Sequence, residues 1–479
     1  MLPVRPLNPI TQNGILFTSA ASFGFIRPLG YFHKVINIAQ TMIKRVALLP
    51  IILLTFLILP AQTNQVKQLA YADSLRLVSI FKDIHQNPEP AFMEVRTANI
   101  VATELKALGL NVFTGIAKTG VIGILKNGDG PVVMFRADMD CNSVKEATGL
   151  SYASTKKVKK ADGTEAPVMH ACGHDAHVTW MLGIAKVMVA LKKSWKGTLV
   201  FVSQPAEEIG AGAKAMAADS IYKTIVPIPD YLFGMHTWPT PVGTIVNRVN
   251  ENMSGVDFLD VEFFGTGGHG ALPESTKDPV LMVCNAVLQY QTIISRQISA
   301  TDMAVLTVGS IQTGIDNNVI PSQATAKLSL RWFNQKTRRT ILDGIARINE
   351  GIAFANGLSK DKYPIITMKT TIDPVINDAS ITGKINKEVA NELPQVEVIT
   401  NLPPVMMAED FPYLVKGNNK TVYDFLLVGV ANKVEYDLAI GEGKTAPYTN
   451  HSGAFKVDLS AIPMGVVIGA TALMELLKR

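Results

Sequence analysis

The order of short β-rich runs and amphipathic helices constrains the fold of this chain more than any other feature of its sequence. Between about residues 66 and 251, helical segments such as "YADSLRLVSIFKDIHQNP" alternate with β-rich runs such as "GVIGILKN", "PVVMFRAD", "GTLVFVSQ" and "DYLFGMH". This alternation predicts a mainly parallel sheet that helices cover on both faces. Ligands of such sheets bind beyond the carboxyl ends of the strands.

A block with a different pattern interrupts the alternation between about residues 252 and 371. Its elements follow the order strand, helix, strand, strand, helix, strand, which is the split βαβ arrangement of a compact unit. The strand and helix alternation then resumes from 372 to 479. We therefore predict an α/β fold: a mainly parallel-sheet domain, residues 66–251 and 372–479, with an inserted ferredoxin-like β-α-β-β-α-β unit, residues 252–371.

The first 61 residues differ in composition from the rest of the chain. They contain five basic and no acidic side chains, and the remaining residues carry 40 of each sign. The neutral body therefore gives no electrostatic argument for nucleic-acid binding.

A leader explains the basic excess. "MIKRVALLPIILLTFLILPAQ", which begins at Met42, has a short basic start and then an apolar run of sixteen residues, the pattern of a signal peptide. The run is shorter than the ~20 residues of a comfortable membrane span, so a cleaved leader fits better than an anchor. We expect residues 42–61 to direct export to a periplasm or the medium and to leave no stable membrane span. We expect residues 1–41 to be unstructured or to precede the true start.

The segment "HACGHDAH", residues 170–177, gathers three of the eight histidines and one of the three cysteines of the chain. Chance clustering, a metal site and a cysteine nucleophile beside a histidine base are all compatible with this segment alone. Other residues of the same chemical types follow predicted strands or lie in a later loop: Asp138 and Asp140 in "FRADMD", Glu207 and Glu208 in "SQPAEE", His236 at the end of "GMH", and His451 in "TNHSGAF".

Thiolate, imidazole and carboxylate groups are good ligands for zinc-like divalent ions. One tetrahedral ion needs fewer ligands than the chain offers, whereas two neighbouring ions would use all five candidates: Cys172, His174, Glu208, His236 and His451. Glu207 would then stay free to accept a proton from a water molecule that the ions have acidified.

Six motifs in this order resemble the amidohydrolase branch of the metal-dependent aminoacylase/carboxypeptidase superfamily: "MHACGHDAH", "FVSQPAEE", "GMHTWPTPVGT", "GTGGHGALP", "NNVIP" and "AEDFPYL". That branch includes hippurate hydrolases, auxin-conjugate hydrolases and N-acetyl-diaminopimelate deacetylases. The resemblance extends from "DIHQNPEPAF" near residue 83 to "NHSGAF" near residue 450. It implies two divalent ions per subunit (Zn, Mn, Ni or Co) on the five ligands named above, with Glu207 as general base.

The resemblance also implies roles for residues outside the ligand set. Asp140 would orient a ligand, and His269 in the inserted unit would stabilise the tetrahedral oxyanion, often from the partner subunit of a homodimer. Asn318 and Arg331 would contact the substrate. The chain departs from the family pattern at "DMDCNS", "NHSGAF" and "HQNPEPAF", and these changes affect the pocket wall without removing a ligand.

The expected activity is hydrolysis of the amide bond of an N-acyl amino acid or a similar small conjugate. A metallo-carboxypeptidase or dipeptidase with the same fold is the alternative within the enzyme class. A Cys172 nucleophile predicts inactivation by alkylation and no effect of chelators. An exported binding protein that kept the fold would be inert toward acyl amino acids even with metal bound.

Overall fold

The computed structural model describes residues 65–159, 163–418 and 420–478. The expected leader, 42–61, and the segment 1–41 lie outside the described residues. Among the residues described, no helix combines the length and apolar character needed to cross a bilayer.

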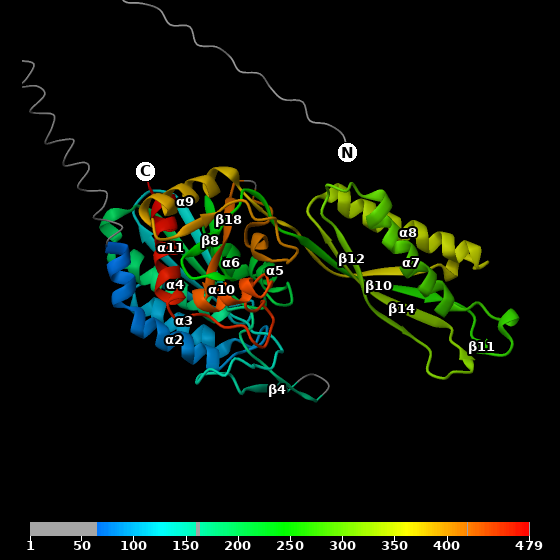
Figure 1. Ribbon diagram of the computed structural model, residues 1–479. Coiled ribbons are helices and arrows are strands. Elements are labelled where there is room, and N and C mark those ends of the chain that lie inside the picture. The colour runs from blue at the N-terminus through cyan, green and yellow to red at the C-terminus, as the bar shows by residue number, and fades with distance from the viewer. Residues whose placement is uncertain (1–64, 160–162, 419, 479) are drawn as a thin grey trace, which may run out of the picture. The chain divides into compact units, whose positions relative to one another are not determined.

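The larger sheet, which contains the strands labelled β8 and β18 in Figure 1, has eight strands in the order β1, β2, β6, β3, β7, β18, β8, β17. The four strands at its centre, β6, β3, β7 and β18, pair in parallel, whereas β1 and β2 extend one side with antiparallel pairs. The prediction of a mainly parallel sheet is confirmed. The strands are β1 (Asn111–Ile116), β2 (Gly120–Asn127), β3 (Val132–Asp138), β6 (Gly197–Gln204), β7 (Tyr231–Pro241), β8 (Thr244–Val246), β17 (Glu397–Ile399) and β18 (Val422–Ala431).

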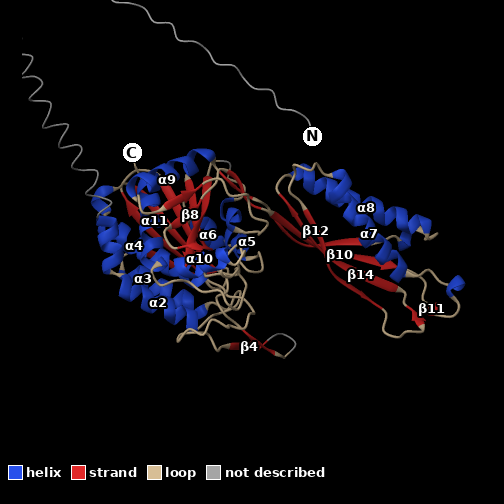
Figure 2. Cartoon of the chain, viewed as in Figure 1, coloured by secondary structure: helices blue, strands red, loops and turns tan. Residues whose placement is uncertain are grey.

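Helices cover both faces of this sheet (Figure 2). One face packs against α2 (Ser74–Gln86), α3 (Val95–Ala107), α4 (His174–Ala190), α9 (Ala379–Glu392) and α11 (Ala461–Leu476). The other face packs against α5 (Gly212–Ala218), α6 (Ser220–Ile225) and η4 (Phe411–Val415). Because β3, β6 and β18 are covered on both sides, they are nearly continuous apolar runs and not alternating ones.

The inserted segment forms a second sheet with its own apolar core. All neighbours in its order, β12, β14, β10, β15, pair antiparallel, and two helices pack on it, as the strand and helix order predicts. Its elements are β10 (Gly255–Phe264), α7 (Pro279–Gln297), β12 (Val305–Thr313), β14 (Gln323–Trp332), α8 (Gln335–Ala355) and β15 (Ile365–Ile372).

Three short strand pairs complete the fold. The chain enters and leaves the inserted segment through β9 (Asn250–Met253) and β16 (Val375–Asn377), which pair antiparallel with each other. Within the inserted segment, β11 (Gly268–His269) pairs with β13 (Val319–Ile320). A hairpin of β4 (Lys157–Lys159) and β5 (Glu165–Pro167) precedes α4, and α10 (Lys433–Gly441) follows β18.

Candidate metal centre

The "HACGHD" segment turns sharply just before α4 and presents its cysteine and histidine to the sheet. Gly173 precedes the first residue of the helix with φ +81°, and a Cβ there would lie 2.6 Å from the side chain of Thr237. The turn therefore requires glycine. Cys172 and His174, on either side of it, are both buried.

His236 lies within β7 and not at its end, which corrects the sequence-based expectation. In the register, Arg136 of β3 is opposite Gly234 of β7, so the level at which β3 ends at Asp138 is the level of His236. His236 thus reaches the carboxyl edge of the sheet because β7 continues beyond its neighbour to Pro241.

Hydrogen bonds fix which histidine nitrogens are free to bind a cation. Nδ1 of His236 donates to the carbonyl of Thr237 at 2.8 Å, which leaves Nε2 as the ligand atom, 3.5 Å from Sγ of Cys172. His177 has no free nitrogen: its Nδ1 is 2.5 Å from Asp138, and its Nε2 accepts from the amide of Thr237 at 2.8 Å. His177 and His236 belong to one group of candidate ligand atoms with Asp138 and His174, but His236, unlike His177, keeps a ring nitrogen that no backbone or carboxylate group occupies.

The two consecutive glutamates are held by Asp140. Its two carboxylate oxygens accept the backbone amides of Glu207 and Glu208, each at 3.0 Å. Oδ1 of Asp140 also lies 3.5 Å from Nδ1 of His174. Ala206, immediately before the pair, has a left-handed backbone with φ +52°, a strained conformation for a residue other than glycine.

His451 reaches the same place from the loop that follows α10. Its amide donates to the carbonyl of Ala171 at 2.8 Å, which ties this loop to the "HACGHD" segment. Nε2 of His451 is 3.2 Å from Oε2 of Glu208. The side chain is half exposed, and φ is +65°, so a second site residue is held in a left-handed conformation.

The donor atoms fit divalent cations. Cys172, Glu208 and His451 offer ligand atoms that all lie within 4.8 Å of one another, and so do His174, Glu207 and Glu208. Glu208 belongs to both groups, so the two groups offer ligand atoms for two neighbouring ions. Both ring nitrogens of His174 and Oε1 of Glu208 are buried without a hydrogen-bond partner among the described residues.

The electrostatics of the cluster also favour cations. Burial, then the charges of Glu409 and Glu208, raise the pKa of the Glu207 carboxyl well above its usual range. Burial opposes a protonated His174, but Asp138 and Asp140 outweigh burial and raise its pKa well above the ordinary value. An excess of negative groups therefore holds a proton that a divalent ion would displace, because metals bind neutral imidazole.

A buried ion-pair network lies beside the candidate metal centre, and the sequence alone indicates no role for it. Arg136 donates to both carboxylate oxygens of Glu409, at 2.7 and 3.1 Å, and lies 2.8 Å from Asp138 and 3.5 Å from Asp410. Its Nε donates to Gln204 at 2.9 Å. Glu409 and Asp410 belong to the quoted "AEDFPYL" motif, but nothing in that motif indicates a partner 273 residues earlier.

A second buried network joins α2 to the first turn of α4. Nδ1 of His85 is 2.6 Å from Asp175, the neighbour of His174, and its Nε2 is 3.2 Å from Glu146. Burial alone would lower the pKa of His85, but the bonds to these two carboxylates outweigh it and raise the pKa to about 9. His170 is buried with neither ring nitrogen bonded among the described residues, and it contributes to no group of ligand atoms.

The residues expected to contact substrate divide into two sets. Arg331 lines a cavity of about 390 Å³ together with Cys172, Glu207 and His451, whereas His269 and Asn318 do not line it. His269 and Asn318 are exposed on the β11 and β13 ladder, where the amide of Gly270 donates to the carbonyl of Asn318. The chain thus brings the five expected ligands, Glu207, Asp140 and Arg331 together, and leaves His269 and Asn318 elsewhere.

The fold and the donor set define a metal-dependent hydrolase of the α/β class. A family model described as Peptidase family M20/M25/M40 matches residues 134–468. The chain belongs to this family, and it is a metal-dependent amide hydrolase.

Three relatives illustrate the range of the family. A hippurate hydrolase of Campylobacter jejuni is 36% identical over 346 residues, which cover 72% of this chain and 85% of that protein. An N-acetylcysteine deacetylase of Bacillus subtilis is 36% identical over 59% of this chain and 72% of its own length. The crystal structure of the Bacillus subtilis YXEP protein, described as a dinuclear metal-binding peptidase from the M20 family, has a TM-score of 0.68 at 26% identity, and the match covers 85% and 99% of the two chains.

Proposed function

We propose that this protein hydrolyses the amide bond of N-acyl amino acids with two divalent ions and Glu207 as general base. The observation that carries the proposal is the turn at residues 206–208, held by Asp140, which brings two consecutive glutamates to one donor cluster. Glu208 shares ligand groups with Cys172, His174 and His451. The metals, when bound, would polarise the amide carbonyl and lower the pKa of a water molecule.

Glu207 would carry the proton through the reaction. It lies beside the donor cluster, 3.9 Å from His174, and its side chain is 11% exposed, so a substrate in the cavity can reach it. As a base it takes the proton of the attacking water, and as an acid it returns that proton to the leaving amine nitrogen. A carboxyl whose pKa burial raises is suited to hold a proton between these steps.

Arg331 supports an amino acid as the leaving group. Its guanidinium lines the cavity and contacts the ring of Phe258 at 5.9 Å, and no carboxylate of the described residues pairs with it. An arginine without an acidic partner in a substrate cavity is suited to bind a carboxylate through two parallel hydrogen bonds. The free carboxylate of an N-acyl amino acid supplies that partner.

Replacing each glutamate in turn tests the proposal. In the metal-loaded enzyme, Glu207→Gln should keep two ions per chain and reduce kcat by about 10²–10⁴-fold, the usual contribution of a general base. Glu208→Gln should instead lower metal content, as measured by elemental analysis after dialysis. Exposed Glu442→Gln is the matched control. Full activity in a chelated sample, with inactivation by thiol alkylation, would support a Cys172 nucleophile instead.

Two further features belong to the proposal. We propose that residues 42–61 direct export, to a periplasm or the medium, and that the inserted segment forms a homodimer in which His269 of one subunit serves the other. The position of His269 away from its own cavity is consistent with that arrangement.

A further inference from the structure

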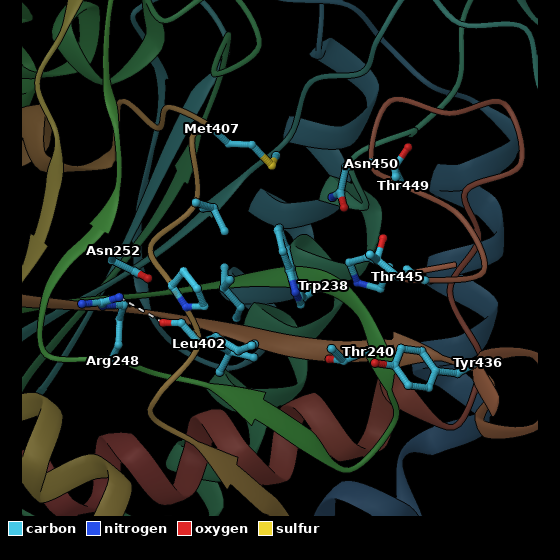
Figure 3. A pocket seen from close by; sticks show the side chains of 16 residues that line it. Trp238, Thr240, Arg248, Asn252, Leu402, Met407, Tyr436, Thr445, Thr449 and Asn450 are labelled. Carbon is cyan, nitrogen blue, oxygen red and sulfur yellow. Dashed lines mark hydrogen bonds between the residues drawn. The ribbon is translucent and has the colours of Figure 1, made fainter. Parts of the chain in front are cut away.

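A second cavity, of about 370 Å³, adjoins the metal centre (Figure 3). It shares Met407 and Asn450 with the cavity that contains the metal-ligand residues. The two spaces are therefore adjacent compartments of one site. Its walls come from three stretches of the larger domain, 238–252, 402–427 and 436–450.

Two of these stretches contain residues that are close in sequence to expected metal ligands. Trp238 is two residues beyond His236 on β7 and therefore on the same face of the strand. Asn450 immediately precedes His451, and its amide nitrogen lies 3.6 Å from Sγ of Cys172. A group attached to a carbonyl held at the donor cluster can enter this cavity directly.

The lining is mostly apolar and contains no carboxylate. Apolar side chains form most of it: Trp238, Pro239, Val246, Leu402, Pro403, Val405, Met407, Leu427 and Ala446. The one charged side chain of this lining is Arg248, which donates to the carbonyl of Leu402 at 3.0 Å, on the side of the view away from Asn450 (Figure 3). A guanidinium at an apolar wall can stack on an aromatic ring.

The volume indicates the size of the group that fits. An apolar cavity of ~150 Å³ is large enough to bind benzene, so a cavity of about 370 Å³ has space for an aromatic ring and several further atoms. The methyl of an acetyl group would leave most of the apolar wall uncovered.

We infer that this cavity binds the acyl group of the substrate and selects an aromatic acyl group, such as benzoyl or an arylacetyl, over acetyl. The inference rests on the proposed function, because it names the acyl part of the same substrate.

The test compares N-benzoyl, N-indolylacetyl, N-succinyl and N-acetyl derivatives of one amino acid with the metal-loaded full chain. Each added methylene in an apolar pocket changes kcat/KM by roughly 10–200-fold, so the aromatic substrates should exceed the acetyl one by at least about a hundredfold. Ala446→Trp fills the cavity from a partly buried loop position and should reduce that preference at least tenfold. Exposed Lys444→Trp, in the same loop but outside the lining, is the matched control.

Binding of the product acids separates this inference from the proposed function. Calorimetric titration should show that indolylacetate binds the wild type and Lys444→Trp, that Ala446→Trp weakens it, and that acetate binds none of them measurably. Such binding without turnover of any substrate would support the cavity and refute the amide substrates. Turnover with acetyl or succinyl preferred, or a preference that Ala446→Trp leaves unchanged, would overturn the inference and leave the proposed function intact.

Discussion

Arg136 gives a quantitative test of how the framework behind the metal centre is held together. Its side chain has no exposed surface and contacts Asp138 at 2.8 Å and Glu409 at 2.7 Å. Burial and the charge of Glu409 raise the pKa of the third carboxyl, Asp410, to about 8, so that Asp410 is largely protonated at pH 7. Arg136→Met would leave Glu409 buried without a cation and would remove the arginine partner of Asp138, and breaking such a buried ion pair costs about 3–5 kcal/mol.

A double-mutant cycle with Glu409→Gln measures the part of this cost that belongs to the ion pair. Urea unfolding of the wild type, both single variants and the double variant, at pH 7 and one metal concentration, gives the four free energies. Because Glu409→Gln removes one of the stranded charges, the double variant should be about 1.5–3 kcal/mol more stable than additivity predicts. The exposed pair Lys433 and Asp437 at 2.9 Å is the control, and Lys433→Met should cost less than about 1 kcal/mol. Additive losses, or a loss below about 1 kcal/mol for Arg136→Met, would refute this reading of the network.

Three further predictions concern the turn, the inserted segment and pH. Gly173→Ala should lower the free energy of unfolding by roughly 2–5 kcal/mol, because it adds left-handed strain and a clash with Thr237, and it should weaken metal binding. Gly149→Ala is the control, since φ is +72° there and the space around it is open, so it should show the strain alone. Equal losses of stability in the two variants would exclude the clash. His269→Ala should reduce turnover at least tenfold with metal content unchanged, and a loss of metal in elemental analysis would contradict the oxyanion role. The pKa of His85 is raised on folding, so its contribution to the free energy of unfolding is complete below pH 6.5 and disappears as pH rises through about 9. Urea unfolding should therefore show that the stability advantage of the wild type over His85→Gln falls by on the order of 3 kcal/mol across this range. Parallel stability curves for the two proteins would refute the assignment.

The sequence predicted the parts of this protein that depend on local pattern and residue chemistry. Alternating strands and helices predicted the parallel sheet, and the change of pattern near residue 252 predicted the second sheet. The ligand types predicted a common donor cluster for Cys172, Glu208 and His451, and the structure brings these three within ligand distance.

What the sequence did not predict depends on contacts between distant segments. Arg136 is an ordinary charged residue within an apolar strand until Glu409 packs against it from 273 residues away. The position of His236 within β7 follows from how far β3 extends beside it, which no pattern inside β7 records. The apolar cavity has no sequence signature either, because Trp238, Leu402 and Ala446 become one wall only after the chain folds.

The glutamate turn shows why residues that never meet the substrate determine what this site can do. Two consecutive side chains normally diverge, so a turn must bring Glu207 and Glu208 to one cluster, and Ala206 adopts a left-handed backbone to make it. Such strain costs on the order of 1–3 kcal/mol. Asp140 offsets it by accepting both glutamate amides, and Glu94 accepts the amide of Ala206 at 2.9 Å; hydrogen bonds to charged groups contribute about 1.5–3 kcal/mol each. The separation that we propose between a metal ligand, Glu208, and a proton carrier, Glu207, therefore depends on the turn and its two buried carboxylates, and it would be lost with them even if both glutamates remained.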